Sequence, residues 1–518
     1  MVIPDFETGF CMQVALNELY RGLKIPLGFS VLATRLAAVL LASLLAALIF
    51  RDKGPGSVAA LVFLLPLVAI ARDWQKIRLH RQSLFLLCVT LLSIAGVALE
   101  PGFLNLTMSW AMLSALAVTL HLGDGLTSLQ TLGAIFRNYL KAPGHACRRL
   151  APVEMLEGAK KSWGGRSLAG LSVGALALPI VAVVVFGSLL ITANPVLENF
   201  ARKFDIVSLI DLILSRGLVI FVLAFALLWP LLHVAVARRP EAHTVVDQNS
   251  PAWHRLFFRP ATVALTLLLL NGMFGFENLL DLWNVWLVQV LPGDYSHAEY
   301  VHRGAYTLVV TAILAALLMI FALWPHSATA KSVTVQRLVY LWMGQNLLLL
   351  GSSAKRTLSY VNAYGWTEWR LAGLIWMGLV GFGLATIIWR VWLTRDNKWL
   401  INANLVAAAV LLVVCGLMDF RGRIADWNVE RFLNNPNVKF DVHYNGNLGV
   451  TALPALRRLH NLQVPNQLGV HTGWLTPQNS TYLANHITST EIYARRIQHD
   501  WQSWTWRYSD LLAVGARP

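Results

Sequence analysis

A series of long apolar blocks constrains the fold of this chain more than any other sequence feature. Most of these blocks run for roughly 18 to 22 residues, the length that crosses a bilayer as a helix. Only 13% of the 518 residues are charged, whereas soluble domains carry about 25%. Because a helix satisfies its own backbone hydrogen bonds in lipid, the sequence predicts an all-α, polytopic transmembrane helical bundle.

The apolar blocks predict about 11 spans in total. The first block begins near Val31 and lacks the small-residue cleavage site of a signal peptide, so we expect it to be a span. The expected spans are 31–50, 57–71, 83–99, 104–122, 168–192, 217–237, a seventh that starts near Ala261, then 305–324, 336–353, 370–392 and 402–420.

The formal charge of +15 indicates how these spans are oriented. Most of the surplus lies in short loops between apolar blocks, as the positive-inside rule requires, although the outer loops with Arg51 and Arg356 run against it. Membrane lipids are therefore the expected partners, and nucleic acid is not. The expected divisions are a cytoplasmic segment at 1–30, spans one to six at 31–259 with a basic cytoplasmic loop at 123–167, spans seven to eleven at 260–420, and a periplasmic C-terminal region at 421–518.

The basic loop contains a pattern typical of an amphipathic helix. Apolar side chains recur there at helical spacing. Such a helix either lies in the interface of the inner leaflet or packs against neighbouring spans, and the pattern fits both. The residues that carry it are Leu126, Leu129, Leu132, Ile135, Phe136 and Leu140.

The stretch from Asn271 to Tyr306 collects ionisable residues within an otherwise apolar part of the chain. Such residues are costly at membrane depth, so by default they mark a functional site. Arg303 stands where the chain re-enters the membrane, and it could hold a phosphate or carboxylate or simply extend to the interface. The candidate ligand or partner site consists of Glu277, Asp281, Asn284, Asp294, His297, Glu299, His302, Arg303 and Tyr306.

Two carboxylates in this stretch are four residues apart. Glu277 and Asp281 are therefore expected to share a helix face, which Asn284 continues. Such a pair could bind a cation, share a proton or accept a basic partner. The structural alternatives are solvation just beyond the bilayer and an ion pair with a basic residue, the candidates being Arg303, Lys355 and Arg356.

Neither the histidines nor the cysteines have the spacing of a metal site. His297, Glu299 and His302 are ligand types that zinc accepts, but their spacing is not the helical H-E-x-x-H arrangement. We therefore expect no metal and no cofactor. The four cysteines are also without a metal-ligand or redox spacing, and they are Cys11, Cys88, Cys147 and Cys415.

Polar amides punctuate the later spans. Amides in membrane helices usually tie helices together, which is the default interpretation, and around a cavity they would line a binding site. These residues are Gln345, Asn346, Asn402, Asn404 and, just beyond the last span, Asn428.

From Arg421 onward the hydropathy falls, and the remaining part of about 100 residues is long enough for a small domain. Leu453, Leu456 and Leu459 predict an amphipathic helix within it. An aromatic group close to the end either anchors the chain at the membrane interface or offers a platform for a carbohydrate or lipid headgroup. Its members are Trp501, Trp504, Trp506 and Tyr508.

The second half contains, in order, AEYVHRGAY, GQNLLLLGSSAKRTLSYVNAYGWTEWRLAGLIWM, WLINANLVAA, DFRGRIADWNV and FDVHYNGNLGVTALPALRRL. These blocks resemble a family of bacterial multi-pass inner-membrane proteins that share a conserved domain of unknown function, the DUF4173/DUF4153-like type. The resemblance covers residues 260–510, and the first half is generic by comparison. It implies a bacterial inner membrane and a compact helical bundle, and it carries over no activity, substrate or catalytic residue.

The sequence favours a non-enzymatic role, because it shows no Ser-His-Asp order, no Gly-rich phosphate loop and no paired-cysteine motif. We expect a regulatory, sensory or interaction protein with a polar periplasmic site and a periplasmic or membrane protein partner. One alternative is a transporter or lipid-handling protein with its cavity around Glu277, Asp281 and Arg303. A membrane enzyme acting on a lipid-linked envelope substrate is another. The sequence predicts no oligomeric state.

Overall fold

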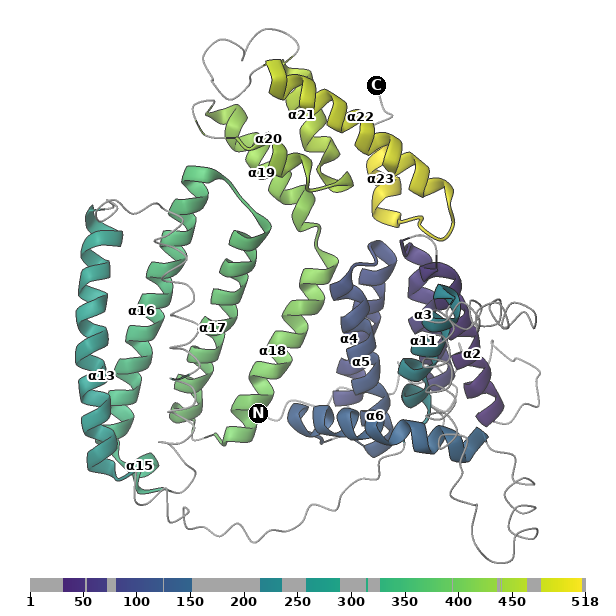
Figure 1. Ribbon diagram of the computed structural model, residues 1–518. Helices are drawn as coiled ribbons and strands as arrows, with labels where there is room; N and C mark the ends of the chain where they lie inside the picture. Colours follow the sequence, from purple (N-terminus) through teal and green to yellow (C-terminus); the bar gives the residue numbers. More distant parts are fainter. Residues whose placement is uncertain are drawn as a thin grey trace, which may run out of the picture.

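The computed structural model describes residues 31–51, 54–71, 81–123, 125–150, 215–234, 258–288, 314, 327–393, 395–435, 438, 440–463 and 477–514. Every regular element among these residues is helical, which confirms the all-α prediction. Figure 1 shows two groups of upright helices side by side and a smaller group across one end. We call the upright groups the first and second lobes and the smaller group the C-terminal region.

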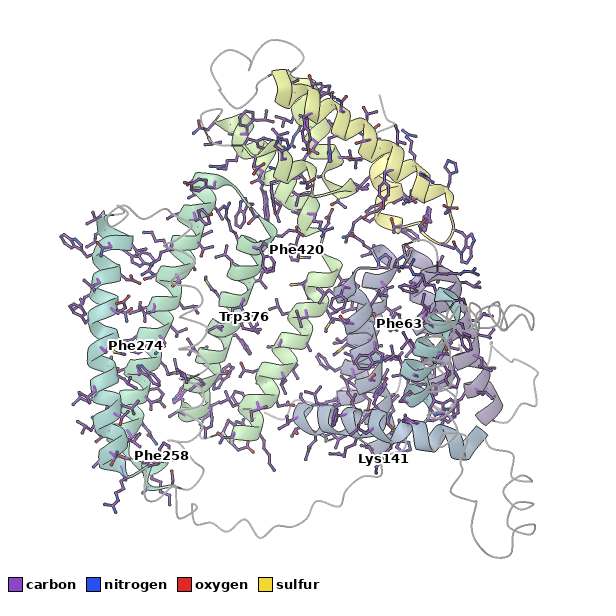
Figure 2. All side chains as sticks on the ribbon, viewed as in Figure 1. Phe63, Lys141, Phe258, Phe274, Trp376 and Phe420 are labelled. Carbon is purple, nitrogen blue, oxygen red and sulfur yellow. The ribbon has the colours of Figure 1, made fainter. Side chains whose placement is uncertain are left out.

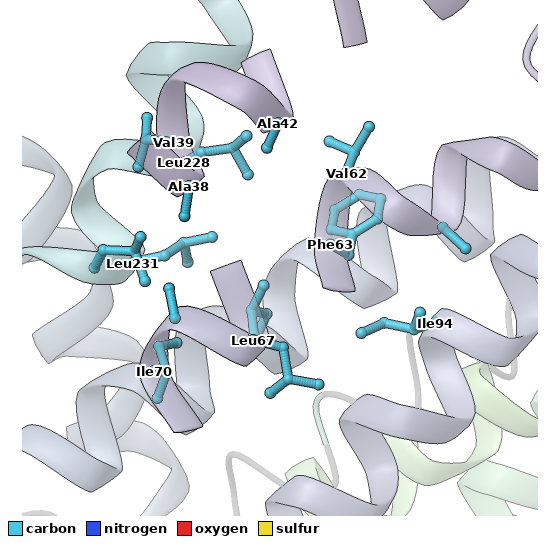
Figure 3. Close-up of a cluster of buried hydrophobic side chains, with 14 of the residues drawn as sticks. Ala38, Val39, Ala42, Val62, Phe63, Leu67, Ile70, Ile94, Leu228 and Leu231 are labelled. Atoms are coloured by element: carbon cyan, nitrogen blue, oxygen red, sulfur yellow. The ribbon is translucent and has the colours of Figure 1, made fainter. Parts of the chain in front are cut away.

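The first lobe is an apolar bundle around one core. Its helices are α2 (Val31–Phe50), η1 (Ser57–Ala59), α3 (Ala60–Ala71), α4 (Arg81–Leu99), α5 (Phe103–Leu122) and α11 (Arg216–Leu232). Figure 3 shows Phe63 and Leu67 of α3 packed between Ile94 of α4 and Leu228 of α11. Ala38 and Ala42 on α2 are buried in the same core, and such small residues let membrane helices approach closely.

The second lobe is a row of helices in which each packs on the next. The row consists of α13 (Pro260–Asp281) with its continuation η4 (Leu282–Val288), α16 (Val333–Tyr364), α17 (Glu368–Trp392) and α18 (Asn397–Leu417), and the short α15 (Ala328–Lys331) precedes α16. Leu267, Val339, Met343 and Leu384 form its buried core. Figure 2 shows Phe258 at the lower end of this lobe and Trp376 halfway along it.

Helix α18 joins the two lobes, because it packs on α17 and also on α4 and α5. α18 meets the first lobe tightly at Gly416, whose carbonyl accepts a hydrogen bond from Asn105 Nδ2 at 3.0 Å. A Cβ atom at position 416 would overlap Asn105 Oδ1. Gly416 therefore sets the spacing between the lobes.

Five helices of the second half begin with a residue whose side chain caps the helix N-terminus. Ser332, Thr367, Asp396, Asp419 and Asp441 each accept the backbone N–H three residues further on. A side-chain oxygen at this position satisfies one of the backbone donors that a helix start leaves unpaired. These residues fix where α16, α17, α18, α19 and α20 start.

Helix α6 (Ser128–Leu150) lies crosswise at the end of the first lobe opposite the C-terminal region, as Figure 1 shows. Ala134 packs with Val118 and Leu122 of α5, and Asn138 donates to the Pro230 carbonyl at 2.8 Å. The helix therefore packs against its neighbours, one of the two alternatives that the sequence leaves open. Its apolar stripe nevertheless stays exposed, at Leu129, Leu132, Phe136 and Leu140.

The C-terminal region has a core of its own. It consists of α19 (Phe420–Asn434), α20 (Val442–Gly446), η5 (Val450–Ala452), α21 (Leu453–Gln463), α22 (Pro477–His499) and α23 (Trp506–Val514). Leu453, Leu456 and Leu459 are buried together against Ile424 and Phe432 of α19, so the predicted amphipathic helix is confirmed.

The number of spans is confirmed only in part. Five described helices are long and apolar enough to cross a membrane, and α2, α3 and α11 are shorter apolar helices at predicted spans. α16 lies at the predicted ninth span, but its polar residues keep it outside the set of five. The predicted spans 168–192 and, except for Leu314, 305–324 lie outside the described residues, so the prediction of about 11 spans is not established.

Neighbouring helices such as α4 and α5, or α17 and α18, run antiparallel, whereas α13 and α16 run in the same direction. Figure 1 places the turn between α5 and α6, the start of α13, α15 and the turn between α17 and α18 at one end of the lobes. The turns from α4 to α5 and from α16 to α17 lie at the opposite end, next to the C-terminal region. Each of these two groups corresponds to one predicted side of the membrane.

Candidate functional site

A polar seam runs between α13 and α16 through the otherwise apolar second lobe. Asn271 Nδ2 donates to the Leu338 carbonyl at 3.1 Å, and Asn278 Nδ2 donates to the Gln345 carbonyl at 3.2 Å. Gln345 Nε2 in turn donates to the Asn271 carbonyl at 3.2 Å. The first two contacts advance by the same number of residues along both helices, so α13 and α16 run parallel.

A buried ion pair closes the upper end of this seam. Asp281, the last residue of α13, is 4% exposed, and its Oδ1 accepts a hydrogen bond from Arg356 of α16. The backbone changes here from α-helix to the π-helix η4, and such π segments often mark functional positions. Arg356 neutralises Asp281, which confirms the ion pair that the sequence offers as an alternative to ligand binding.

Trp286 of η4 extends the contact between the two helices beyond the ion pair. Its indole Nε1 donates to Ser352 Oγ of α16 at 3.1 Å. The Lys355 ammonium lies 4.3 Å from the centre of the same ring, a cation–π distance. These contacts fix η4, the continuation of α13, against α16.

The two predicted carboxylates lie in different surroundings. Asp281 is buried in the seam, whereas Glu277 is exposed and Asn284 is half-buried. Four residues along an α-helix make one full turn plus about 40°. Glu277 therefore lies past the edge of the helix face that Asn278 and Asp281 share. The remaining members of the predicted site lie outside the described residues, and they are Asp294, His297, Glu299, His302, Arg303 and Tyr306.

No group of His, Cys, Asp and Glu in the described part of the chain could hold a metal ion. The predicted ligand types His297, Glu299 and His302 are not within that part. Cys88 and Cys415 are free thiols.

The amides of the later spans mostly join helices, as their default interpretation predicts. Asn402 Oδ1 accepts from the backbone N–H and the hydroxyl of Ser128 at 2.7 and 2.6 Å, which connects α18 to α6. Asn404 Nδ2 donates to Thr386 Oγ1 of α17 at 3.0 Å. Asn346 instead donates to the Trp342 carbonyl of its own helix at 2.7 Å.

The C-terminal region holds the turn between α16 and α17 through one amide. Asn428 of α19 accepts the Trp366 N–H at 2.6 Å, donates to the Trp366 carbonyl at 2.9 Å and donates to Asn445 Oδ1 at 3.0 Å. Gly365 has a φ of +85°, and a Cβ there would lie 2.8 Å from Asn428 Oδ1. Only glycine adopts this backbone conformation readily, and only a residue without a Cβ leaves room for the Asn428 side chain.

Charged and phenolic side chains surround the same turn. Glu368 forms an ion pair with Arg421 Nε at 2.9 Å, and this hydrogen bond raises the pKa of Arg421. The Glu368 N–H donates to Tyr444 Oη at 2.7 Å. Arg431 donates to the Asn362 carbonyl, and burial together with nearby Arg370 lowers the pKa of Arg431. The turn is thus tied to both α19 and α20.

A second junction links the C-terminal region to the first lobe. Arg507 Nη1 of α23 pairs with Glu100 Oε2 at the end of α4 at 2.6 Å, and its Nη2 donates to the Leu417 carbonyl of α18 at 2.9 Å. Tyr508 Oη donates to Glu100 Oε1 at 3.4 Å. Burial and the Glu100 charge raise the pKa of Tyr508.

The aromatic group near the chain end belongs to a third junction. The Gly56 N–H donates to the Gln502 carbonyl at 2.6 Å, and the Ser57 N–H donates to the Trp504 carbonyl at 2.7 Å. Trp504 and Trp506 meet edge to face, whereas Trp501 and Trp506 stay exposed. The turn before α23 is therefore docked on the connection between α2 and η1.

The family model described as a domain of unknown function, DUF4153, matches residues 36–459. The chain belongs to the DUF4153 family. The DUF4153 match includes both lobes and extends through most of α21, so the first half of the chain is part of the family and not generic as the sequence comparison suggests. Comparisons with curated proteins and with solved structures give no match.

The family-like blocks of the second half meet in the structure. GWTEWR forms the α16–α17 turn, DFRGRIADWNV starts α19, and FDVHYNGNLG contains α20, where Asn428, Glu368 and Tyr444 make their contacts. This part of the DUF4153 fold is a polar junction that the sequence reasoning did not identify as a site. Its sequence signal is Asn428, one of the polar amides that the sequence leads us to expect between helices.

Proposed function

We propose that this protein has a regulatory, sensory or interaction role and spans a bacterial inner membrane several times. The C-terminal region lies on the periplasmic side and binds a protein partner or effector. Five apolar helices of membrane-spanning length and the basic residues around α6 and α15 support this placement.

The observation that carries the proposal is that the C-terminal region contacts helix ends in both lobes. It holds the α16–α17 turn through Asn428, the end of α4 through Arg507, and the α2–η1 connection through Gln502 and Trp504. Packed networks of this kind carry energetic coupling between distant sites. A partner that shifts the C-terminal region therefore acts on the first and second lobes together.

The surroundings of Asp281 and Glu277 favour this regulatory role over transport. A transporter requires polar groups that converge on a cargo. Asp281 is instead paired with Arg356, and Glu277 is exposed on the surface of α13. A buried, compensated ion pair holds two helices in one register. The transport and lipid-handling roles remain the alternatives that the experiment has to separate.

The test combines site-specific photocrosslinking in cells with native mass spectrometry of the gently extracted protein. A photoreactive residue at Tyr493, exposed on α22, is compared with one at Met273, exposed on α13. We expect a discrete protein adduct from position 493, none from position 273, and the same partner bound stoichiometrically. A retained small molecule with no protein partner, or a defined lipid whose binding does not depend on α6 with no protein partner, would overturn the proposal in favour of transport or lipid handling.

A further inference from the structure

Helix α6 has one face buried against the protein and an opposite face that is exposed. Thr131, Ala134, Asn138 and Ala142 are buried against the first lobe and α18. The other face carries only large apolar side chains at helical spacing, namely Leu129 (58% exposed), Leu132 (51%), Phe136 (66%) and Leu140 (66%). Contiguous apolar surface of this kind marks an interaction site with a protein or a membrane.

The charge of α6 indicates which of these it meets. Its sequence, SLQTLGAIFRNYLKAPGHACRRL, contains no acidic residue and the basic residues Arg137, Lys141, Arg148 and Arg149. Helical spacing puts Arg137 and Lys141 on one flank of the apolar stripe, together with Gln130. A basic helix with one apolar face is typical of segments that lie in the membrane surface and attract anionic lipids.

The position of α6 fits the same environment. The helix lies crosswise to the upright helices at their lower end, and Figure 2 labels Lys141 at this end of the first lobe. Tyr139 Oη donates to the Leu227 carbonyl of α11 at 2.8 Å, so α6 lies against the side of the bundle and not only beneath it. Its open face is therefore directed away from the bundle, at the level where the apolar helices end.

We propose that α6 binds anionic phospholipid at this end of the molecule. Phe136, Leu132 and Leu140 enter the acyl layer, and Arg137 and Lys141 bind the lipid phosphates. Ser128 joins this helix to Asn402 of α18, so the lipid surface also reaches the helix that connects the two lobes. The inference is independent of the regulatory role proposed for the C-terminal region.

The first experiment measures where the apolar face lies. In full-length protein with its four cysteines replaced by alanine, a single Phe136→Cys or Gln130→Cys carries an environment-sensitive fluorophore in lipid vesicles. We expect brominated acyl chains to quench the label at 136, and aqueous iodide to quench the label at 130. Iodide quenching at 136 would show a solvated face, and no quenching by either would show a face covered by protein. Either result overturns the proposal.

The second experiment tests the headgroup. The binding of phosphatidylglycerol and of phosphatidylcholine is titrated by native mass spectrometry for the wild type, Arg137→Gln/Lys141→Gln, and the control Lys331→Gln/Arg337→Gln. The control removes two exposed cations at the same end of the second lobe. We expect the α6 variant to lose phosphatidylglycerol affinity by roughly fivefold per charge, while the control and phosphatidylcholine change little. An equal loss of phosphatidylglycerol affinity in both variants would show that the net charge of the protein explains the binding. That result would overturn the specific role of α6.

Discussion

Asn428 of α19 pairs with the backbone of Trp366 in the α16–α17 turn, accepting its N–H at 2.6 Å and donating to its carbonyl at 2.9 Å. One side chain thereby satisfies both backbone groups of a residue 62 positions away. Asn428 is buried, and its amide also donates to Asn445. The position of the turn is consequently set by the C-terminal region as well as by the helices that it connects.

The first prediction concerns this amide. Asn428→Ala leaves the Trp366 N–H and carbonyl and Asn445 Oδ1 without their partner in a buried place, and each such group costs about 1–3 kcal/mol. We expect lower stability in SDS unfolding and faster hydrogen exchange at residues 365–368. Asn434→Ala, at an exposed position of the same helix, should change stability by less than about 0.5 kcal/mol. Equal effects of the two changes would contradict a specific role of Asn428.

The second prediction concerns the spacing of the lobes. Gly416→Ala puts a Cβ where Asn105 Oδ1 lies, and Asn105 is held by the Gly96, Glu100 and Gly416 carbonyls. Over-packing of this kind costs about 1–3 kcal/mol. We expect a lower midpoint of thermal unfolding in detergent.

The control for the lobe spacing is Gly373→Ala on α17, where a Cβ meets open space. Because alanine favours helix over glycine by about 1 kcal/mol, this change should leave the midpoint unchanged or raise it. A midpoint for Gly416→Ala that follows the control would show that Asn105 yields and that the close approach is not required.

The helices could be predicted from the sequence because their signal is local. The length of an apolar block and the residues at its ends are properties of one stretch, so α4, α5, α13, α17 and α18 appear close to their predicted bounds. The amphipathic pattern at 126–140 likewise predicts α6. Which face of α6 packs depended on small residues such as Ala134, which a pattern of large apolar residues does not reveal.

The polar contacts were less predictable because they depend on pairing between distant parts of the chain. Arg356 was one of three possible basic partners for Asp281, and only the parallel packing of α13 and α16 selects it. Glu277 and Asp281 differ in burial because the helix rotates between them. The spacing of four residues in the sequence predicted that both lie on the same face. The sequence marks Asn428 as an amide that could tie helices together, but no local pattern identifies Trp366 as its partner.

The third prediction separates the two carboxylates. Asp281→Asn removes the charge that compensates Arg356 in a buried place, and breaking such a pair costs about 3–5 kcal/mol. Glu277→Gln changes an exposed residue and should cost less than about 0.5 kcal/mol. The measurement is SDS unfolding of each variant in mixed micelles.

A double-mutant cycle decides whether Asp281 acts through Arg356. Asp281→Asn combined with Arg356→Gln removes both charges, so the double variant should be more stable than Asp281→Asn alone. Strict additivity of the two single changes would show that the residues do not interact. A large loss from Glu277→Gln would instead restore the joint carboxylate site.

The fourth prediction concerns alkaline pH and the junction at Glu100. Burial and the Glu100 carboxylate raise the pKa of Tyr508 above the value of about 10 that a tyrosine has in the unfolded chain. The folded protein then keeps the phenolic proton at a pH where the unfolded chain has lost it. The stabilisation is complete below pH 10 or so and is lost as the pH rises further, by up to about 1.4 kcal/mol per pH unit. We therefore expect Tyr508→Phe to flatten the fall in unfolding free energy above this pH. Identical slopes for the wild type and Tyr508→Phe would show that the phenol of Tyr508 is not held against Glu100 in the folded protein.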